Sequence, residues 1–175
     1  MKRILCILLI AVFAISMAGE KTAATLITQA ERKAGSGQKN VLVIFHASWC
    51  GWCKKLDAFL DDPQFKPIMD KNYVIVHLDV MENGPQKSLE TPGGEDVMKE
   101  YGAEKSGLPF FFILDKHGMK LADSNNGKKG NIGYPAAPDE IAHFMEMLSK
   151  SAQHLSPDES EKIAAHLKAT APAQH

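Results

Sequence analysis

The amino-acid sequence predicts an α/β fold in which helices flank a central mixed β-sheet. Two observations carry this prediction: short apolar, β-branched runs of strand length, and segments with helical spacing of apolar residues between them. With 175 residues, of which 45% are hydrophobic and 23% charged, the chain is long enough for one domain with a substantial core. Its formal net charge of −1 gives no indication of a nucleic acid or an anionic membrane surface as partner.

Residues 1–18 have the pattern of a secretory signal peptide. Lys2 and Arg3 precede an apolar run that ends at Ala18, where small residues favour cleavage. As a helix this run would rise only about 22 Å, which is short of the roughly 30 Å of a bilayer core. An uncleaved membrane anchor is therefore the less favoured alternative. We expect a periplasmic or secreted mature chain that has no membrane attachment after cleavage.

The first half of the mature chain alternates helices and strands. Residues 22–33 have helical spacing, and the segment GSGQKN at 35–40 ends that helix. Residues 41–45 are continuously apolar, as in a strand that is buried on both faces. A helix is expected from about 50 to 60, and a second strand over 73–80.

The second half contains two loops and the remaining elements. Residues 82–94 and 123–137 are rich in turn formers and lack an apolar period, which indicates loops. The last helix begins at Ser156, because Ser156 and Glu159 match a capping box. The other predicted elements are a helix at 95–102, strands at 110–115 and 119–123, and a helix at 138–150.

The loss of Cys6 with the signal leaves Cys50 and Cys53 as the cysteines of the mature chain. In an oxidising compartment such a pair forms a disulfide unless something reduces it. A purely structural disulfide across four residues would contribute only about 2 kcal/mol. A zinc site needs four ligands, although two thiolates with His46 as a third ligand would suit copper.

Thiol–disulfide exchange is the third interpretation of the pair, and it is the favoured one. Cys50 follows a buried strand and begins a helix, where unpaired N–H groups and the helix dipole stabilise a thiolate. Cys53 lies one turn later and can attack a mixed disulfide formed at Cys50. Trp49 and Trp52 provide a flat apolar surface around the sulfur atoms.

Two segments carry a resemblance to a known family. Residues 41–57, VLVIFHASWCGWCKKLD, resemble the active-site segment of the thioredoxin superfamily, and residues 92–118, PGGEDVMKEYGAEKSGLPFFFILDKHG, resemble its second characteristic segment. The resemblance covers about residues 22–150 and is greatest to secreted bacterial proteins with a WCxWCK motif. It implies a thioredoxin-like domain over 19–152, followed by an extra C-terminal helix and tail at 153–175.

The resemblance also implies roles for individual residues. Cys50 becomes the attacking thiol and Cys53 the resolving thiol, with no cofactor and no metal. Pro109 matches a cis-proline that faces the disulfide, and Leu108 before it offers free backbone groups to a substrate. Trp49 and Trp52 then complete the substrate-binding surface. The implied partners are protein thiols or disulfides, together with an unidentified redox partner that recharges the pair.

The sequence departs from thioredoxin at positions that matter for proton transfer. Ile44 stands where thioredoxin has a buried aspartate that is thought to deprotonate the resolving cysteine. His46 and His77 are the candidates for a replacement proton relay, and ordinary packed or surface histidines are the alternative. Trp52 stands where oxidising isomerases have a histidine, which favours a reductant over an oxidant.

The resulting hypothesis is a thiol–disulfide oxidoreductase that exchanges its Cys50–Cys53 disulfide with protein substrates outside the cytoplasm, as a reductant. The alternative from another class is a non-catalytic binding module, which would hold a partner through the loops at 82–94 and 123–137. A copper carrier is the third hypothesis.

Overall fold

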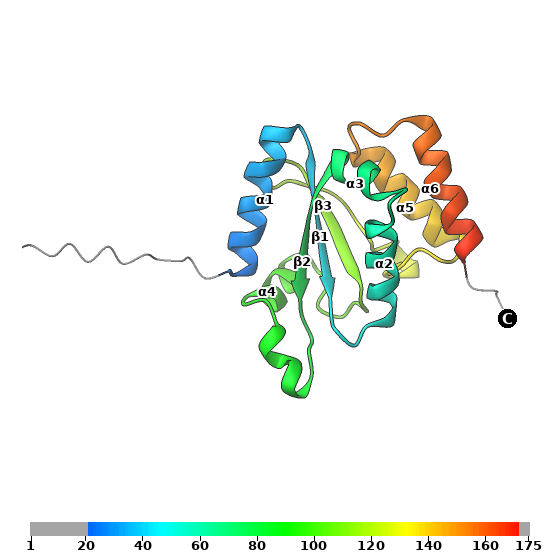
Figure 1. Cartoon of the computed structure of the whole chain (residues 1–175). Coiled ribbons are helices and arrows are strands. Elements are labelled where there is room, and N and C mark those ends of the chain that lie inside the picture. The colour runs from blue at the N-terminus through cyan, green and yellow to red at the C-terminus, as the bar shows by residue number, and fades with distance from the viewer. Residues whose placement is uncertain (1–20, 172–175) are drawn as a thin grey trace, which may run out of the picture.

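The computed structural model describes residues 21–171, so the predicted signal peptide lies outside the described residues. Figure 1 shows a sheet with helices on both faces. The helices are α1 (Ala23–Gly37), α2 (Gly51–Asp61), α3 (Lys66–Asn72), α4 (Gly94–Glu100), α5 (Pro138–Ser151) and α6 (Pro157–Thr170), with 3₁₀ turns η1 (Gly84–Leu89) and η2 (Gly127–Lys129). The strands are β1 (Asn40–His46), β2 (Tyr73–Asp79), β3 (Phe110–Leu114) and β4 (Lys120–Asp123).

The four strands form one mixed sheet in the order β2-β1-β3-β4. Strand β1 runs parallel to β2 and antiparallel to β3, and β3 runs antiparallel to β4. The predicted fold class is therefore confirmed, including the mixed character of the sheet.

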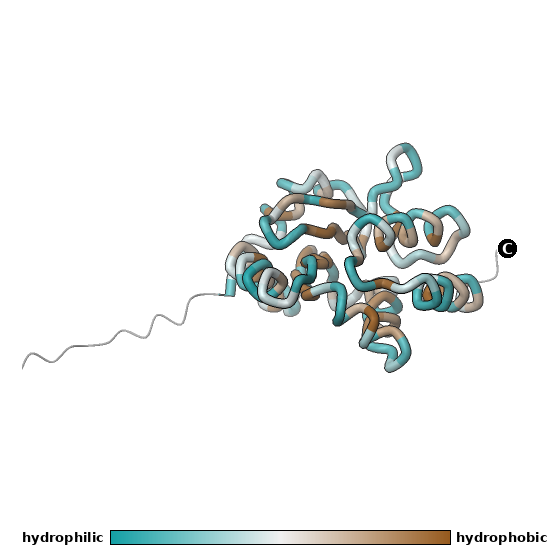
Figure 2. Tube along the Cα trace, turned by 90° about the horizontal axis from the view of Figure 1, so that it is seen from above, coloured by the Kyte–Doolittle hydropathy of each residue, from teal (hydrophilic) through white to brown (hydrophobic). Residues whose placement is uncertain are grey.

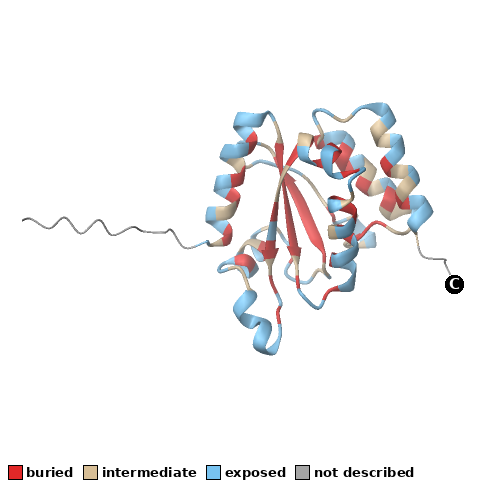
Figure 3. Ribbon diagram, viewed as in Figure 1, coloured by how far each residue is buried: buried red, intermediate tan, exposed pale blue. Residues whose placement is uncertain are grey.

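Alternation along β1 divides the core into two layers, because successive side chains of a strand point to opposite faces. Leu42 and Ile44 pack in the core on the side of α2, α3, α5 and α6. Val41, Val43 and Phe45 pack on the opposite side, against α1 and α4. Strands β1 and β3 are buried along most of their length (Figure 3), and hydrophobic residues concentrate in the interior segments (Figure 2). The continuous apolar run at 41–45 is explained by this double burial.

Helix α1 is longer than predicted and includes the glycines that were expected to end it. Its buried stripe continues to Ala34, which is 0% exposed, so packing against the sheet holds the last turn in place. The helix ends at Gln38, which adopts the left-handed conformation at φ 51°. Burial outweighs the low helix propensity of glycine here.

Helix α3 was not predicted from the sequence. It has seven residues, with a proline in its first turn, and it buries Ile68 and Met69. A segment this short shows only one apolar repeat, which is too little for a periodicity to be recognised. The 82–94 segment, predicted as a loop, contains the 3₁₀ turn η1.

Helix α6 begins as predicted, with a capping box between Ser156 and Glu159. Glu159 also forms an ion pair with Lys71 of α3 at 2.6 Å. Ile163 and Leu167 are fully buried in the core that α6 shares with α5 and α3. The C-terminal helix is thus part of the folded unit. Within residues 21–171, none of the helices combines the length and the apolarity that a membrane span needs.

Candidate active site

The two cysteines lie where β1 passes into α2, and they form a disulfide with a Cα–Cα distance of 5.3 Å. Cys50 is the N-cap of α2, and its Sγ accepts a hydrogen bond from the backbone N–H of Cys53 at 3.1 Å. The first N–H groups of a helix have no partner inside the helix, and here the sulfur satisfies one of them. The same N–H and the positive end of the helix dipole would stabilise a thiolate at Cys50 after reduction.

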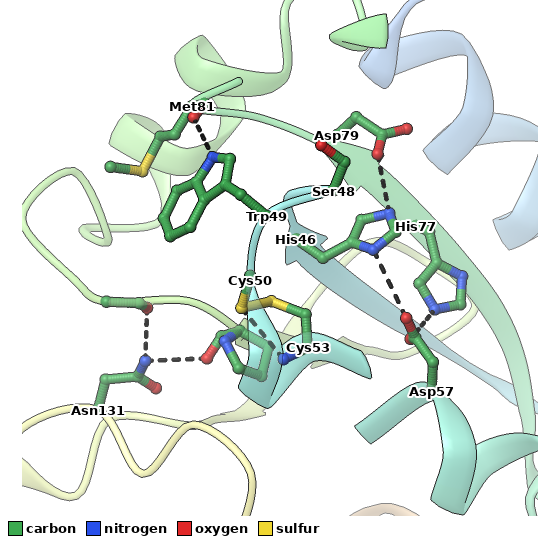
Figure 4. The surroundings of a disulfide bond; sticks show 12 residues. His46, Ser48, Trp49, Cys50, Cys53, Asp57, His77, Asp79, Met81 and Asn131 are labelled. Atoms are coloured by element: carbon green, nitrogen blue, oxygen red, sulfur yellow. Dashed lines mark hydrogen bonds and ion pairs between the residues drawn. A yellow bond between two sulfur atoms is a disulfide. The ribbon is translucent and has the colours of Figure 1, made fainter. Parts of the chain in front are cut away.

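The cysteines are almost completely buried, with exposed fractions of 4% for Cys50 and 1% for Cys53. The tryptophans beside them are exposed, Trp49 at 52% and Trp52 at 45%. Trp49 Nε1 donates a hydrogen bond to the Met81 carbonyl at 2.8 Å. Trp52 stacks on Tyr134 with ring centroids 6.2 Å apart. These contacts hold two large apolar surfaces at the rim of the disulfide, as Figure 4 shows for Trp49.

The segment that faces the disulfide contains a cis peptide bond between Leu108 and Pro109. Leu108 packs against the buried cluster of Ala47, Cys50 and Cys53. Asn131 Nδ2 donates hydrogen bonds to the carbonyls of Gly107 at 2.7 Å and Pro109 at 2.9 Å (Figure 4). The backbone N–H and C=O of Leu108 form no hydrogen bond within residues 21–171. Asn131 therefore fixes the two carbonyls that flank a residue with free backbone groups.

A buried carboxylate supports the turn before the cysteines. Glu82 is only 3% exposed. It accepts hydrogen bonds from the backbone N–H of Ser48 at 2.5 Å and from Ser48 Oγ at 2.7 Å. Its own N–H donates to Glu90 Oε1 at 2.9 Å. Through Glu82 the segment after β2 is fastened to the turn that carries Trp49 and Cys50.

Two histidines and two aspartates gather behind the disulfide. His46 Nε2 lies 3.1 Å from Asp79 Oδ1, and His46 Nδ1 lies 3.7 Å from Asp57 Oδ2. His77 Nε2 lies 3.1 Å from Asp57 Oδ1, and the two imidazole rings are 5.0 Å apart. Asp57 follows Cys53 by four residues on α2, so both occupy the same face of that helix (Figure 4). Among the described residues, no group of three or more histidine, cysteine or acidic side chains is arranged to hold a metal ion.

This arrangement shifts two pKa values in opposite directions. The Asp57 carboxylate, 3.7 Å from His46 Nδ1, raises the pKa of His46 above 6.5, with further help from the charges of Asp79 and Glu82, and burial opposes the rise. Burial by itself would raise the pKa of Asp57. The neighbouring imidazoles of His46 and His77 outweigh that effect and hold the pKa of Asp57 well below its ordinary value. Both shifts favour the ion pair.

The structure brings all eight site residues named from the sequence to one edge of the sheet and to the face of α2 beside it. Further polar residues of the site were not named, namely Asp57, Asp79, Glu82 and Asn131. The spacing of Asp57, four residues after Cys53, was the one local signal available for any of them. Glu82 and Asn131 lie in the two segments that were predicted to be loops, and their contacts depend on how those segments fold back.

The comparisons with known proteins agree with this geometry. A protein disulfide-isomerase of Zea mays is 38% identical over 114 residues, which are 65% of this chain and 18% of that protein. A protein disulfide-isomerase of Triticum aestivum is 30% identical over 126 residues, which are 72% of this chain and 20% of that protein. The chain thus spans about a fifth of the length of these relatives.

The similarity extends to a solved structure and to a family model. The disulphide isomerase from Xylella fastidiosa Temecula1 superposes with a TM-score of 0.51 at 18% identity, over 83% of this chain and 88% of that one, which shows a shared fold. The model of a family described as thioredoxin-like matches residues 24–116, a span that contains both cysteines and Pro109. This match covers more than half of the chain, and the chain therefore belongs to the thioredoxin-like family.

Proposed function

We propose that the protein is a thiol–disulfide oxidoreductase that reduces disulfides of protein substrates outside the cytoplasm. The observation that carries the proposal is the disulfide at the N-terminus of α2, packed against Leu108 before a cis-proline. Relatives that are named protein disulfide-isomerase support the same class of chemistry.

The proposed reaction has two steps. In the first, the Cys50 thiolate attacks one sulfur of a substrate disulfide, forming a mixed disulfide and releasing the other substrate sulfur as a thiolate that takes up a proton. In the second, Cys53 loses its proton and its thiolate attacks Cys50 Sγ, which releases the second substrate thiol and leaves the Cys50–Cys53 disulfide. The substrate gains two electrons and two protons. A dithiol partner must then return them to the protein.

The order of attack follows from position on the helix. Cys50 Sγ accepts the N–H of Cys53 and lies at the positive end of α2, so Cys50 is the better thiolate. Cys53 is the more buried cysteine, and Leu108 packs over the pair. Trp49, Trp52, Leu108 and Pro109 form the surface that receives the substrate.

We assign the proton of Cys53 to the cluster of His46, Asp57 and His77. The core position before the active-site turn holds Ile44, which is 0% exposed and carries no acid. The cluster lies on the face of α2 that Cys53 shares with Asp57, and the Asp57 carboxylate raises the pKa of His46 above 6.5. A base with a pKa near the working pH is the most effective proton acceptor.

Location and direction rest on the sequence. The pattern of residues 1–18 supports export, and Trp52 in place of a histidine between the cysteines supports the reducing direction.

The test is the reduction of a disulfide-bonded protein, insulin, by the reduced protein in a single turnover. Cys53→Ser should accumulate a mixed disulfide at Cys50, whereas Cys50→Ser should form none. Lys54→Ser, next to the pair, serves as the matched control and should react like the wild type. If the Cys50→Ser, Cys53→Ser double variant reduces insulin as fast as the wild type, the proposal is wrong and a binding module remains.

A further inference from the structure

Strand β2 is one edge of the sheet, and β1 is the strand beside it. The N–H of Val80, directly after β2, donates to a β1 carbonyl at 3.0 Å. The N–H and C=O of Asp79 point the other way, where they bond to Thr91 at 3.0 and 2.9 Å. Because the direction of the backbone groups alternates along a strand, the N–H and C=O of Ile75 and His77 also point away from β1, and no strand of the described residues lies beside them.

The two edges of the sheet differ in how they are protected. Edge strands usually avoid pairing with other chains by being short, bulged or charged. Strand β4, at the other edge, has four residues, a register shift against β3 and Lys120 at its start. Strand β2 pairs with β1 over seven residues without a shift, and its first four residues, YVIV, are apolar. Strand β2 is therefore the edge suited to accept a further strand.

A groove of about 680 Å³ lies beside these free backbone groups. Its lining includes Tyr73, Val74, Ile75 and His77 of β2, and it continues onto α1, α2 and α3. In Figure 1, α1 covers one face of the sheet, and α2 and α3 cover the other. A strand paired with β2 would fill the groove between these two helical layers, with its side chains facing α1 and α2 in alternation.

The charges of the lining differ between the two layers. On the α1 side, Lys33 is exposed and has no ion pair with another described residue. The other side has carboxylates and ammonium groups from Asp57, Asp61, Asp70, Lys39 and Lys66. Both of these lysines are held at α3, because Lys66 Nζ lies 3.5 Å from the Asp70 carboxylate and Lys39 donates to the backbone carbonyl of Asp70. The part of this side that belongs to α2 is acidic.

We propose that the free edge of β2 binds an extended segment of another polypeptide in which acidic and basic side chains alternate. Pairing with β2 would supply hydrogen-bond partners to the backbone groups of Ile75 and His77. The acidic side chains of the segment would face Lys33, and its basic side chains would face Asp57 and Asp61. Strand addition of this kind obtains its affinity from the backbone and its selectivity from alternate side chains. The site does not involve the cysteines, so this inference is independent of the proposed function.

A second copy of the chain fits this edge poorly. Two β2 strands related by a two-fold axis pair antiparallel, which places the α1 layers of both copies on the same face of the joined sheet. Lys33 would then approach the α1 side of an identical chain, and the acidic α2 layers would also meet each other. Like charges placed opposite one another across a strand pair are destabilising.

Hydrogen exchange measured by NMR reports directly on this edge. The oxidised mature chain is compared without peptide and with about 1 mM of either of two peptides of identical composition, a concentration suited to weak binding. One peptide alternates glutamate and lysine over eight residues, and the other has four glutamates followed by four lysines. We expect the alternating peptide to slow exchange of the Ile75 and His77 N–H groups about tenfold. The block peptide should have almost no effect, because each of its faces carries both charges.

Reversal of the charge at Lys33 tests the selectivity. In Lys33→Glu both sides of the groove are acidic, and no register of the alternating peptide presents bases to both. We expect the slowing to fall to about threefold, as is typical for the loss of an exposed ion pair. Lys168→Glu, exposed on α6, is the matched control and should behave like the wild type.

Exchange that stays fast with both peptides would overturn the proposal, and so would equal slowing by the two peptides or an unchanged effect in Lys33→Glu. Slow exchange of both amides without peptide would also overturn it, because the edge would then be occupied already. Protection that increases with protein concentration would identify a second copy as the occupant. Protection that is independent of concentration and is lost when residues 19–22 are removed would identify the chain's own N-terminal segment.

Discussion

Asp57 lies one turn of α2 beyond Cys53, and its carboxylate is shared between two histidines from neighbouring strands. His46 comes from the end of β1 and His77 from β2, and both ring systems face the same carboxylate. The chain thereby places a titratable cluster between α2 and the ends of β1 and β2, on the face of α2 that also carries the resolving cysteine, whereas the core position before the active-site turn holds Ile44.

The Asp57 carboxylate should control the second step of exchange. Asp57→Asn removes the charge that raises the pKa of His46, so His46 becomes a weaker base. We expect release of substrate from the Cys50 mixed disulfide to slow by about a hundredfold near neutral pH, a typical size for a lost general base. Stopped-flow measurement of the release across pH 5–9 tests this. Asp61→Asn, exposed on the same helix, should leave the pH profile unchanged, and an unaltered profile in Asp57→Asn would refute the role.

The stability of the oxidised protein should depend on pH through the same cluster. The folded pKa of His46 is raised above 6.5, so its contribution is complete below pH 6.5 and is lost as the pH rises through the folded pKa. The folded pKa of Asp57 is lowered from 3.8, so its contribution is complete above pH 3.8 and is lost as the pH falls through the folded value. The ion pair therefore stabilises most between about pH 4 and 6.5.

Urea unfolding measures this dependence. The difference in unfolding free energy between wild type and His46→Gln should be larger at pH 5.5 than at pH 8.5. A difference that is equal at the two values, or larger at pH 8.5, would contradict the assignment.

Glu82 should matter for stability far more than its place in a loop suggests. Glu82→Ala removes the buried carboxylate that accepts from the backbone N–H and the hydroxyl of Ser48, and a hydrogen bond to a charged group typically contributes about 1.5–3 kcal/mol. Glu82→Gln keeps one acceptor oxygen and should lose less. Glu95→Ala, at an exposed position, is the control and should stay within about 0.5 kcal/mol of the wild type. Chemical denaturation of the oxidised forms gives these free energies of unfolding. A Glu82→Ala variant as stable as the control would show that the hydrogen bonds from Ser48 to Glu82 do not stabilise the fold.

Asn131 should act on substrate turnover through the segment before the cis-proline. Asn131→Ala removes the donor to both flanking carbonyls, and Asn131→Asp replaces it with an acceptor. We expect each to slow insulin reduction by about tenfold, because two lost hydrogen bonds of about 1 kcal/mol each loosen the Leu108 backbone. Asn126→Ala in the same loop should react at the wild-type rate. Equal rates of insulin reduction for Asn131→Ala and Asn126→Ala would show that the hydrogen bonds from Asn131 to the Gly107 and Pro109 carbonyls are not needed for turnover.

Most of the architecture follows from local sequence signals. The run at 41–45 is apolar because β1 is buried on both faces, and the Ser156 capping box begins α6 where expected. Helix α3 is too short for its apolar periodicity to be recognised in the sequence. The end of α1 depends on the packing of Ala34 against the sheet, which is a tertiary contact and cannot be predicted from local sequence.

The residues of the site likewise fall into those that local sequence predicts and those that depend on long-range contacts. Cys50, Cys53 and Pro109 stand in segments with recognisable order and spacing. Asn131 reaches back 22 residues to the Pro109 carbonyl, and Glu82 reaches back 34 residues to Ser48. Contacts between residues so far apart in the chain produce no periodic pattern in the sequence, so only the folded structure reveals them.

The most direct test of the central claim is the reduction potential of the Cys50–Cys53 couple, equilibrated against dithiothreitol and against glutathione. We expect a value of about −270 mV, like that of thioredoxin, which would make the reduced pair a donor of electrons to substrate disulfides. A value of about −120 mV would identify a strong oxidant that inserts disulfides, and it would contradict the proposed direction of exchange.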